Sequence, residues 1–197
     1  MTQIILGSQS PRRQEIFEFF DLSFEQVPPP FTETDIEFTG DVPAYVTAIA
    51  EGKAQVLVKQ HPDDLIITAD TTVYYDGKIF GKPANKEEGC AMLTTLSGQW
   101  HQVFSAVSIT HEQRTLSDVA ETRVLMNALT TEEITKYCEN LLCEDKAGAY
   151  AIQGAGGLIV NKIEGCFYNV MGLPINTLRQ LLQNFGIDLW NHLQISS

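Results

Sequence analysis

Positive charge is scarce in this chain. Its 197 residues include 13 Lys and Arg against 25 Asp and Glu, which gives a formal net charge of -12 at pH 7. Nucleic acids and anionic membrane surfaces repel such a protein at long range, so neither is an expected partner. Any site for phosphate groups must therefore be a local cluster of cations in an acidic molecule.

Sequence features of several other site classes are also missing. The cysteines form no CxxC pair and match no histidine at zinc-ligand spacing, so neither zinc nor a disulfide framework is expected. No apolar run approaches the roughly 18 residues of a membrane span, and no secretion signal is evident. There is no P-loop and no GxGxxG sequence. We expect a cytoplasmic, unprocessed protein with reduced thiols at Cys90, Cys138, Cys143 and Cys166.

Helical patterns alternate with strand patterns along the chain. The length and a hydrophobic content of 44% allow one substantial core. We predict an α/β fold in which helices flank a mixed, twisted sheet, organised as a single domain over residues 1–197. The signals are an apolar strand before Gly7, a helix capped by Asp41, a strand ending at Asp70, a hairpin turn at Asp76-Gly77, and later helices after Asn85, Thr130 and Pro174.

The first predicted strand leads straight into a helix whose first turn carries two arginines. Ser10 suits the N-cap and Pro11 the first helical position. Arg12 and Arg13 then lie where the helix dipole disfavours cations, so we expect an anion to compensate them. Unpaired backbone N–H groups and the hydroxyl of Ser8 would add ligands for a phosphate. The alternative is a pair of solvated arginines.

Two acidic side chains are candidates for a cation site. Asp70 closes an apolar strand, and open α/β sheets bind ligands at such strand ends. Glu33 lies in a proline-rich acidic loop. If that loop folds over Asp70, the two carboxylates could hold Mg²⁺ or Mn²⁺. Asp35 and Glu37 are alternative ligands from the same loop, and the plain alternative is that these acids are solvated.

Two lysines and a glutamine complete the candidate residues. Lys53 falls inside the apolar stripe of the long helix, so its ammonium must reach water or an anionic partner. Lys82 stands between a glycine and a proline, where a stiff backbone would aim it at a fixed point. Gln153 precedes a glycine-rich turn and could read a base edge or be an ordinary polar residue. Cations together with paired carboxylates suit polyphosphate chemistry.

Several ordered blocks resemble the signatures of the Maf family. They extend from about residue 4 to residue 185, and members of this family are cytoplasmic nucleoside triphosphate pyrophosphatases that use a divalent cation. The resemblance implies a Maf-like fold with a central cleft, around which two lobes could form. The blocks are Leu6–Arg13, Ala69–Thr71, Gly81–Pro83, Leu96–His101, Lys146–Gly154 and Asn169–Pro174.

The resemblance also implies roles for the matching residues. Asp70 would accept the proton of the attacking water and contact the metal ion, Glu33 would be a metal ligand or a partner of this base, and Lys82 would assist catalysis. Phosphate groups would be bound by Ser8, Arg13, Lys53 and Lys82.

Substrate preference follows from three further matches. Arg12, Thr71 and Gln153 resemble the subgroup that acts on dTTP and UTP. The subgroup that acts on 7-methyl-GTP tends to carry tryptophan, glutamine and glutamate there. Modified pyrimidine triphosphates are implied as further substrates, in a house-cleaning role. Alternatives are a 7-methyl-GTP pyrophosphatase and a nucleotide-binding regulator of septum formation, and a homodimer is a common state of such folds.

Overall fold

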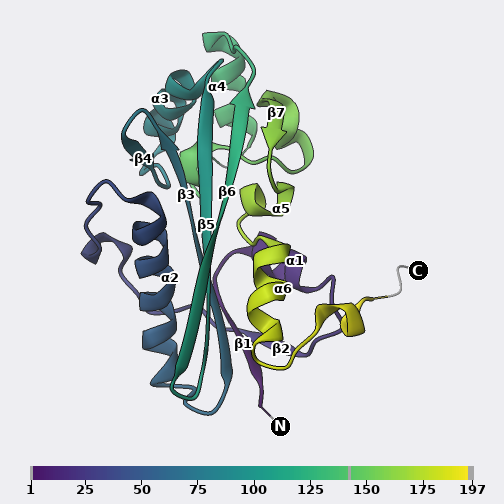
Figure 1. Cartoon of the computed structure of the whole chain (residues 1–197). Coiled ribbons are helices and arrows are strands. Elements are labelled where there is room, and N and C mark those ends of the chain that lie inside the picture. The colour runs from purple at the N-terminus through teal and green to yellow at the C-terminus, as the bar shows by residue number, and fades with distance from the viewer. Residues whose placement is uncertain (1, 142, 195–197) are drawn as a thin grey trace. The chain divides into compact units, whose positions relative to one another are not determined.

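A computed structural model describes residues 2–141 and 143–194 of the chain (Figure 1). Its strands form one mixed sheet in the order β2-β1-β3-β5-β6-β7, with β4 paired to β3. Strand β1 is parallel to β2 and β3, whereas β4 is antiparallel to β3 and β7 to β6. This confirms the predicted α/β class. The strands are β1 (Ile4–Gly7), β2 (Phe24–Gln26), β3 (Leu65–Tyr75), β4 (Lys78–Phe80), β5 (Trp100–His111), β6 (Arg114–Met126) and β7 (Val160–Glu164).

Six α-helices and four 3₁₀ turns connect these strands in the described residues. No helix among them is long and apolar enough to cross a membrane. The α-helices are α1 (Pro11–Phe17), α2 (Val42–Val58), α3 (Lys86–Leu96), α4 (Thr131–Asn140), α5 (Phe167–Met171) and α6 (Ile175–Gln183). The 3₁₀ turns are η1 (Glu33–Asp35), η2 (Ala147–Ala149), η3 (Gly154–Ile159) and η4 (Leu189–His192).

The chain forms two compact units, and each is described by itself. Strands β3, β5 and β6 contribute residues to both. The predicted single domain and central cleft stay predictions. Unit 1 comprises Met1–Asp70, Ser105–Ala120 and Gly172–Ser197, and unit 2 comprises Thr71–Phe104 and Glu121–Met171.

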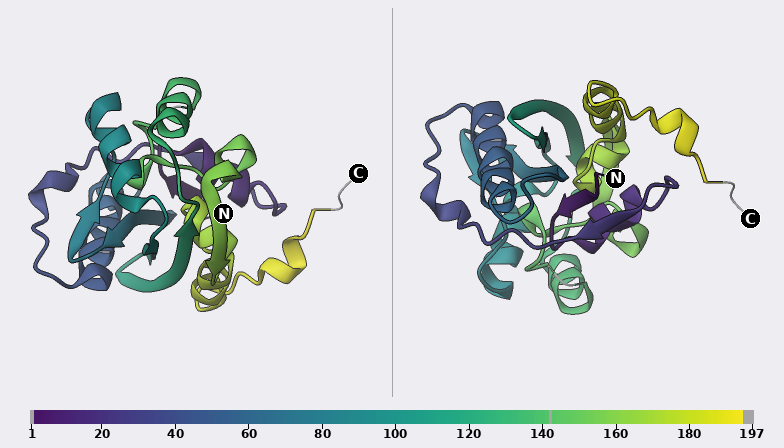
Figure 2. Two further views of the ribbon diagram at one scale, coloured as in Figure 1. Left: turned by 90° about the horizontal axis from the view of Figure 1, so that it is seen from above. Right: turned by 90° about the horizontal axis from the view of Figure 1, so that it is seen from below.

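In unit 1, helix α2 packs lengthwise on the sheet, as all three views show (Figures 1 and 2). The helix begins where the carboxylate of Asp41 accepts a hydrogen bond from the N–H of Ala44 at 3.0 Å, which confirms the predicted cap. The Thr68 hydroxyl of β3 donates to the Ala50 carbonyl at 2.6 Å. This bond fixes the helix against the strand one turn before Lys53. The buried contact consists of Ile5, Ala54, Leu57 and Ile66.

Unit 2 packs α3 and α4 together beside its part of the sheet. Asn85 caps α3 by accepting the N–H of Glu88 at 2.9 Å. Thr130 and Glu133 form the predicted capping box at the start of α4. Local cap signals thus placed both helix starts correctly.

Two local predictions need correction, and a third is confirmed. Strand β3 does not end at Asp70 but continues to Tyr75, because the strand pairs onward with β4. The turn at Asp76-Gly77 is confirmed as a two-residue hairpin loop, with both residues at positive φ. Ser10 occupies the N-cap of α1 but its side chain makes no capping bond.

Candidate functional site

The charged centre of unit 1 consists of Lys53, Asp70 and Glu33. The Lys53 ammonium nitrogen lies 2.8 Å from Asp70 Oδ1 and 2.6 Å from Glu33 Oε1. The side chains of Lys53 and Asp70 are 9% and 8% exposed, whereas that of Glu33 is 47% exposed. A buried ammonium is tolerated only when it is well paired, and here two carboxylates share it. The acidic loop therefore folds toward Asp70, and Glu33 of this loop contacts the Lys53 ammonium.

Three elements bring these side chains together. Lys53 projects from α2, and Glu33 lies in the η1 turn of the acidic loop. Asp70 lies on β3, two residues beyond the last parallel pair with β1, Gly7 with Thr68. Asp70 is thus inside a strand but just past the carboxyl end of the parallel pairing, which is where α/β sheets place their ligands. The position predicted for Asp70 was correct in this respect although the strand end was wrong.

Arg13 and Ser8 lie together at the start of α1. Arg13 donates from Nε to the Gly172 carbonyl at 2.8 Å and from Nη1 to the Ser8 hydroxyl at 3.4 Å. The same hydroxyl accepts the N–H of Ser10 at 3.1 Å, and Ser8 is buried. Ser10 thus caps no N–H of the helix, and its own backbone N–H donates to the Ser8 hydroxyl instead.

The electrostatics of Arg13 connect it to the carboxylates. Burial lowers its pKa, and the negative charges of Asp70 and Glu33 act against that change. Arg12, the next cation on the helix, lowers it slightly further. A guanidinium keeps its charge in any protein. Arg13 is therefore a fixed cation within electrostatic range of the Lys53 centre.

Two residues of this region, Tyr45 and Gly172, were not predicted from the sequence. Burial raises the pKa of the Tyr45 phenol, and the charges of Asp70 and Glu33 raise it as well. Tyr45 lies on α2 at the i−8 position from Lys53, a helical spacing that could have indicated it. Gly172 supplies the carbonyl that holds Arg13, and its φ of +109° suits glycine. Only the fold brings residue 172 next to residue 13.

Arg12 lies on α1 in unit 1, and the other predicted residues lie in unit 2. Thr71 follows Asp70 on β3 and is half-buried. Lys82 is exposed just after β4, and Gln153 is half-buried immediately before η3. The structure thus brings Lys53 together with Asp70 and Glu33, and Arg13 together with Ser8, within unit 1. The roles of all the predicted site residues stay predictions.

The donor set in unit 1 fits a small hard cation. The described residues hold no cluster of three or more His, Cys, Asp or Glu side chains suited to a metal ion. Two carboxylates do converge on one cation, the Lys53 ammonium. Mg²⁺ commonly takes only one or two carboxylates and completes its shell with phosphates and water. Glu33 and Asp70 are therefore the residues that could hold such an ion.

Comparisons with known proteins cover nearly the whole chain. The dTTP/UTP pyrophosphatase of Chlamydia caviae is 43% identical over 192 residues, which span 97% of this chain and 98% of that protein. The dTTP/UTP pyrophosphatase of Clostridium perfringens strain 13 is 41% identical over 190 residues, spanning 95% and 99%. A HAM1 protein from Coxiella burnetii shares the fold at a TM-score of 0.50 and 15% identity, over 93% of this chain and 100% of that one. The family description "Maf-like protein" matches residues 3–185, and the chain therefore belongs to the Maf family.

Proposed function

We propose that this protein is a nucleoside triphosphate pyrophosphatase that hydrolyses dTTP and UTP to the monophosphate and pyrophosphate. The observation that carries the proposal is the Lys53 ammonium held between Asp70 and Glu33, with Arg13 in electrostatic range. Relatives that are 43% and 41% identical bear the name of this activity. Modified pyrimidine triphosphates are further candidate substrates.

The cations of unit 1 would bind the phosphates. A triphosphate carries several negative charges, and Lys and Arg offset them best where water is partly excluded. Lys53 and Ser8 are buried and Arg13 is tied to the Gly172 carbonyl, so these groups are held in place before a ligand arrives. Lys82 would add a fourth contact.

Asp70 would act as the base for the attacking water. The water oxygen bonds to the α-phosphorus, its proton passes to Asp70, and the bond to the oxygen bridging the α- and β-phosphates breaks, so that pyrophosphate leaves. In the free protein the Asp70 carboxylate is occupied by Lys53 at 2.8 Å. A bound phosphate would compete for the ammonium and release the carboxylate for the proton. A divalent cation bound by Glu33 and Asp70 would neutralise charge on the phosphates and on the leaving group.

Three residues would select the base. We assign this filter to Arg12, Thr71 and Gln153, of which Gln153 carries both donors and an acceptor for a base edge. The enzyme would act in the cytoplasm on free nucleotides, with neither nucleic acid nor a membrane as partner, and as a homodimer.

Release of pyrophosphate from a panel of triphosphates tests the proposal. We expect turnover of dTTP and UTP with Mg²⁺ or Mn²⁺, little turnover of 7-methyl-GTP, and a loss of at least about 100-fold in Asp70→Asn, since a general base contributes 10²- to 10⁴-fold. Circular dichroism would establish that the variant is folded. Absence of dTTP and UTP turnover in folded wild-type protein, or full activity in Asp70→Asn, would refute the assignment.

A further inference from the structure

One tyrosine hydroxyl joins both ends of the segment that carries Gln153. The hydroxyl of Tyr137, on α4, accepts a hydrogen bond from the N–H of Ala151 at 3.1 Å. It lies 3.3 Å from the carbonyl oxygen of Gly156, to which it can donate, and 3.5 Å from that of Ala151. Ala151 and Gly156 stand two residues before and three residues after Gln153. A single side chain thus closes the loop around the residue proposed to read the base.

The two ends of this loop approach each other closely. A Cβ atom on Gly156 would lie 2.7 Å from the Ala151 carbonyl oxygen, and one on Gly157 would lie 2.8 Å from that of Ile152. Both distances are too short for a side chain, so glycine is needed at both positions. Gln153 is therefore presented from a compact loop whose shape depends on the backbone being held in place.

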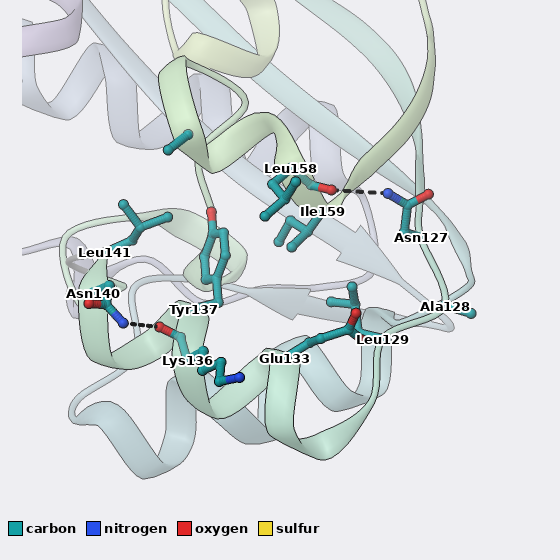
Figure 3. A pocket seen from close by; sticks show the side chains of 11 residues that line it. Asn127, Ala128, Leu129, Glu133, Lys136, Tyr137, Asn140, Leu141, Leu158 and Ile159 are labelled. Atoms are coloured by element: carbon teal, nitrogen blue, oxygen red, sulfur yellow. Dashed lines mark hydrogen bonds between the residues drawn. The ribbon is translucent and has the colours of Figure 1, made fainter.

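A pocket lies against one side of the segment that follows Gln153 (Figure 3). Its volume is about 600 Å³, and Leu158, on its wall, is 80% exposed. Side chains that face open space gain little dispersion energy from neighbours. Ile159 of the same segment is buried in the core of unit 2, so core packing and hydrogen bonds together restrain the segment. Around this pocket stand Ala155, Leu158 and Ile159 of η3, and Glu133, Lys136, Tyr137 and Asn140 of α4.

Further hydrogen bonds hold the segment before and after the loop. Before the loop, the His101 ring nitrogen Nε2 lies 2.7 Å from the Tyr150 hydroxyl, both buried. After the loop, Asn127 donates its side-chain amide to the Leu158 carbonyl at 3.0 Å and its backbone N–H to the Ile159 carbonyl at 2.8 Å. These bonds fix the chain on both sides of the loop that carries Gln153. Between them, the Tyr137 hydroxyl links the loop to α4.

We propose that Tyr137 is a positioning residue that sets the base preference of the enzyme through Gln153, an inference that rests on the proposed function. Hydrogen bonds to a base edge weaken steeply once the donor and acceptor are misaligned. A functional amide must be held within about 0.5 Å of its productive position by the groups around it. Loss of the Tyr137 hydroxyl would let Gln153 move while leaving the phosphate-binding residues of unit 1 untouched.

The test compares Tyr137→Phe with wild type and with two further variants. Tyr137→Phe keeps the ring in the core and removes only the hydroxyl. Thr122→Val is the matched control, because it also removes a buried hydroxyl of unit 2, one bonded to Cys166 and Asn169 and not to the loop. Gln153→Ala gives the loss expected when the reading amide is gone.

We expect the ratio of kcat/KM for UTP to that for CTP to fall about tenfold in Tyr137→Phe, as for a displaced hydrogen bond. The change should lie in KM, with kcat for UTP within about twofold of wild type. Thr122→Val should keep the wild-type ratio. Adding Tyr137→Phe to Gln153→Ala should cause no further fall, because Tyr137 acts only through the Gln153 amide. Amide hydrogen exchange at Ala151 should be about tenfold faster in Tyr137→Phe, since its acceptor is lost.

Each other result overturns the proposal. An unchanged UTP to CTP ratio in Tyr137→Phe, even with faster exchange, would make the hydroxyl structural only. A similar fall in Thr122→Val would reveal general loosening of unit 2. Should wild-type protein turn over no pyrimidine triphosphate, the proposed function fails and the base preference with it. Unaltered amide hydrogen exchange at Ala151 in Tyr137→Phe would show, independently of turnover, that the Tyr137 hydroxyl does not hold the loop.

Discussion

Lys53 faces two carboxylates from a buried position, so its removal should affect stability as well as turnover. Lys53→Met keeps the aliphatic stem but leaves the buried Asp70 carboxylate without its partner. Such uncompensated charges cost about 3–5 kcal/mol, and the exposed Glu33 end of the pair adds little to this figure. Urea unfolding at pH 7.5 would measure the loss, and pyrophosphate release should be abolished.

The control for Lys53 is Lys59→Met, at the exposed C-cap of the same helix. It makes the same change of net charge and should alter the free energy of unfolding by less than about 0.5 kcal/mol. The double variant Lys53→Met with Asp70→Asn should regain part of the lost stability, since no buried charge is then left unpaired and the Glu33 carboxylate is partly exposed to water. Equal losses in Lys53→Met and Lys59→Met would contradict the burial argument.

Arg12 and Arg13 are adjacent in sequence but should differ in their effects. Arg13 is fastened to Ser8 and Gly172 and lies within range of the carboxylates. Arg13→Ala should reduce kcat/KM for every triphosphate by about 100-fold or more, by analogy with other groups that stabilise the transition state. Arg12→Ala should mainly change the ratio among bases. Steady-state kinetics on dTTP, UTP and CTP separates the two outcomes, and a uniform loss in both variants would contradict the division.

Helix starts and tight turns were the most predictable elements of this fold. Asp41, Asn85 and the Thr130–Glu133 pair are short-range signals, because each cap bonds to a backbone group within three residues. The Asp76-Gly77 hairpin is local in the same sense. Such interactions can be predicted without knowing the rest of the fold.

Elements that depend on distant contacts were harder to predict. A charged residue is typical of the end of an apolar strand, but Asp70 lies within β3, where its buried carboxylate pairs with Lys53, 17 residues earlier. The helical spacing of Ile16, Phe19 and Phe20 predicts a longer first helix, whereas α1 ends at Phe17 and Phe19 is 39% exposed. The three-residue strand β2 gave no distinct signal at all.

In the candidate site as well, residues with a local sequence signal could be predicted and those that depend on distant contacts could not. Arg13 and Lys53 could be singled out because each is locally anomalous, a cation at a helix start and a cation in an apolar stripe. Gly172 and Tyr45 are locally unremarkable, and their place depends on chain segments that meet only after folding. The need for glycine at position 7 also comes from a residue distant in sequence. A Cβ there would lie 2.5 Å from Leu57 Cδ1, which explains why this chain has glycine at that position.

The stability of the whole chain should depend on pH through a buried histidine. His101 is 2% exposed, and burial lowers its pKa from 6.5 to about 4. The unfolded chain therefore takes up a proton below about pH 6.5, while the folded chain does not until about pH 4. Stability from this group is present above pH 6.5 and is lost as the pH falls toward 4. Between pH 7.5 and pH 5.0 the loss is about 2 kcal/mol, at 1.36 kcal/mol for each pH unit below 6.5.

Urea unfolding at the two pH values, in wild type and in His101→Gln, isolates this contribution. The variant lacks both the titrating ring and its contact with the Tyr150 hydroxyl, so it should be less stable at pH 7.5 but lose less on acidification. His111→Gln is the control, because His111 lies on the same strand and is partly exposed. The stability of His111→Gln should fall between pH 7.5 and pH 5.0 by as much as that of wild type. If His101→Gln and wild type lose the same free energy between pH 7.5 and 5.0, groups other than this buried histidine govern the acid sensitivity of the fold.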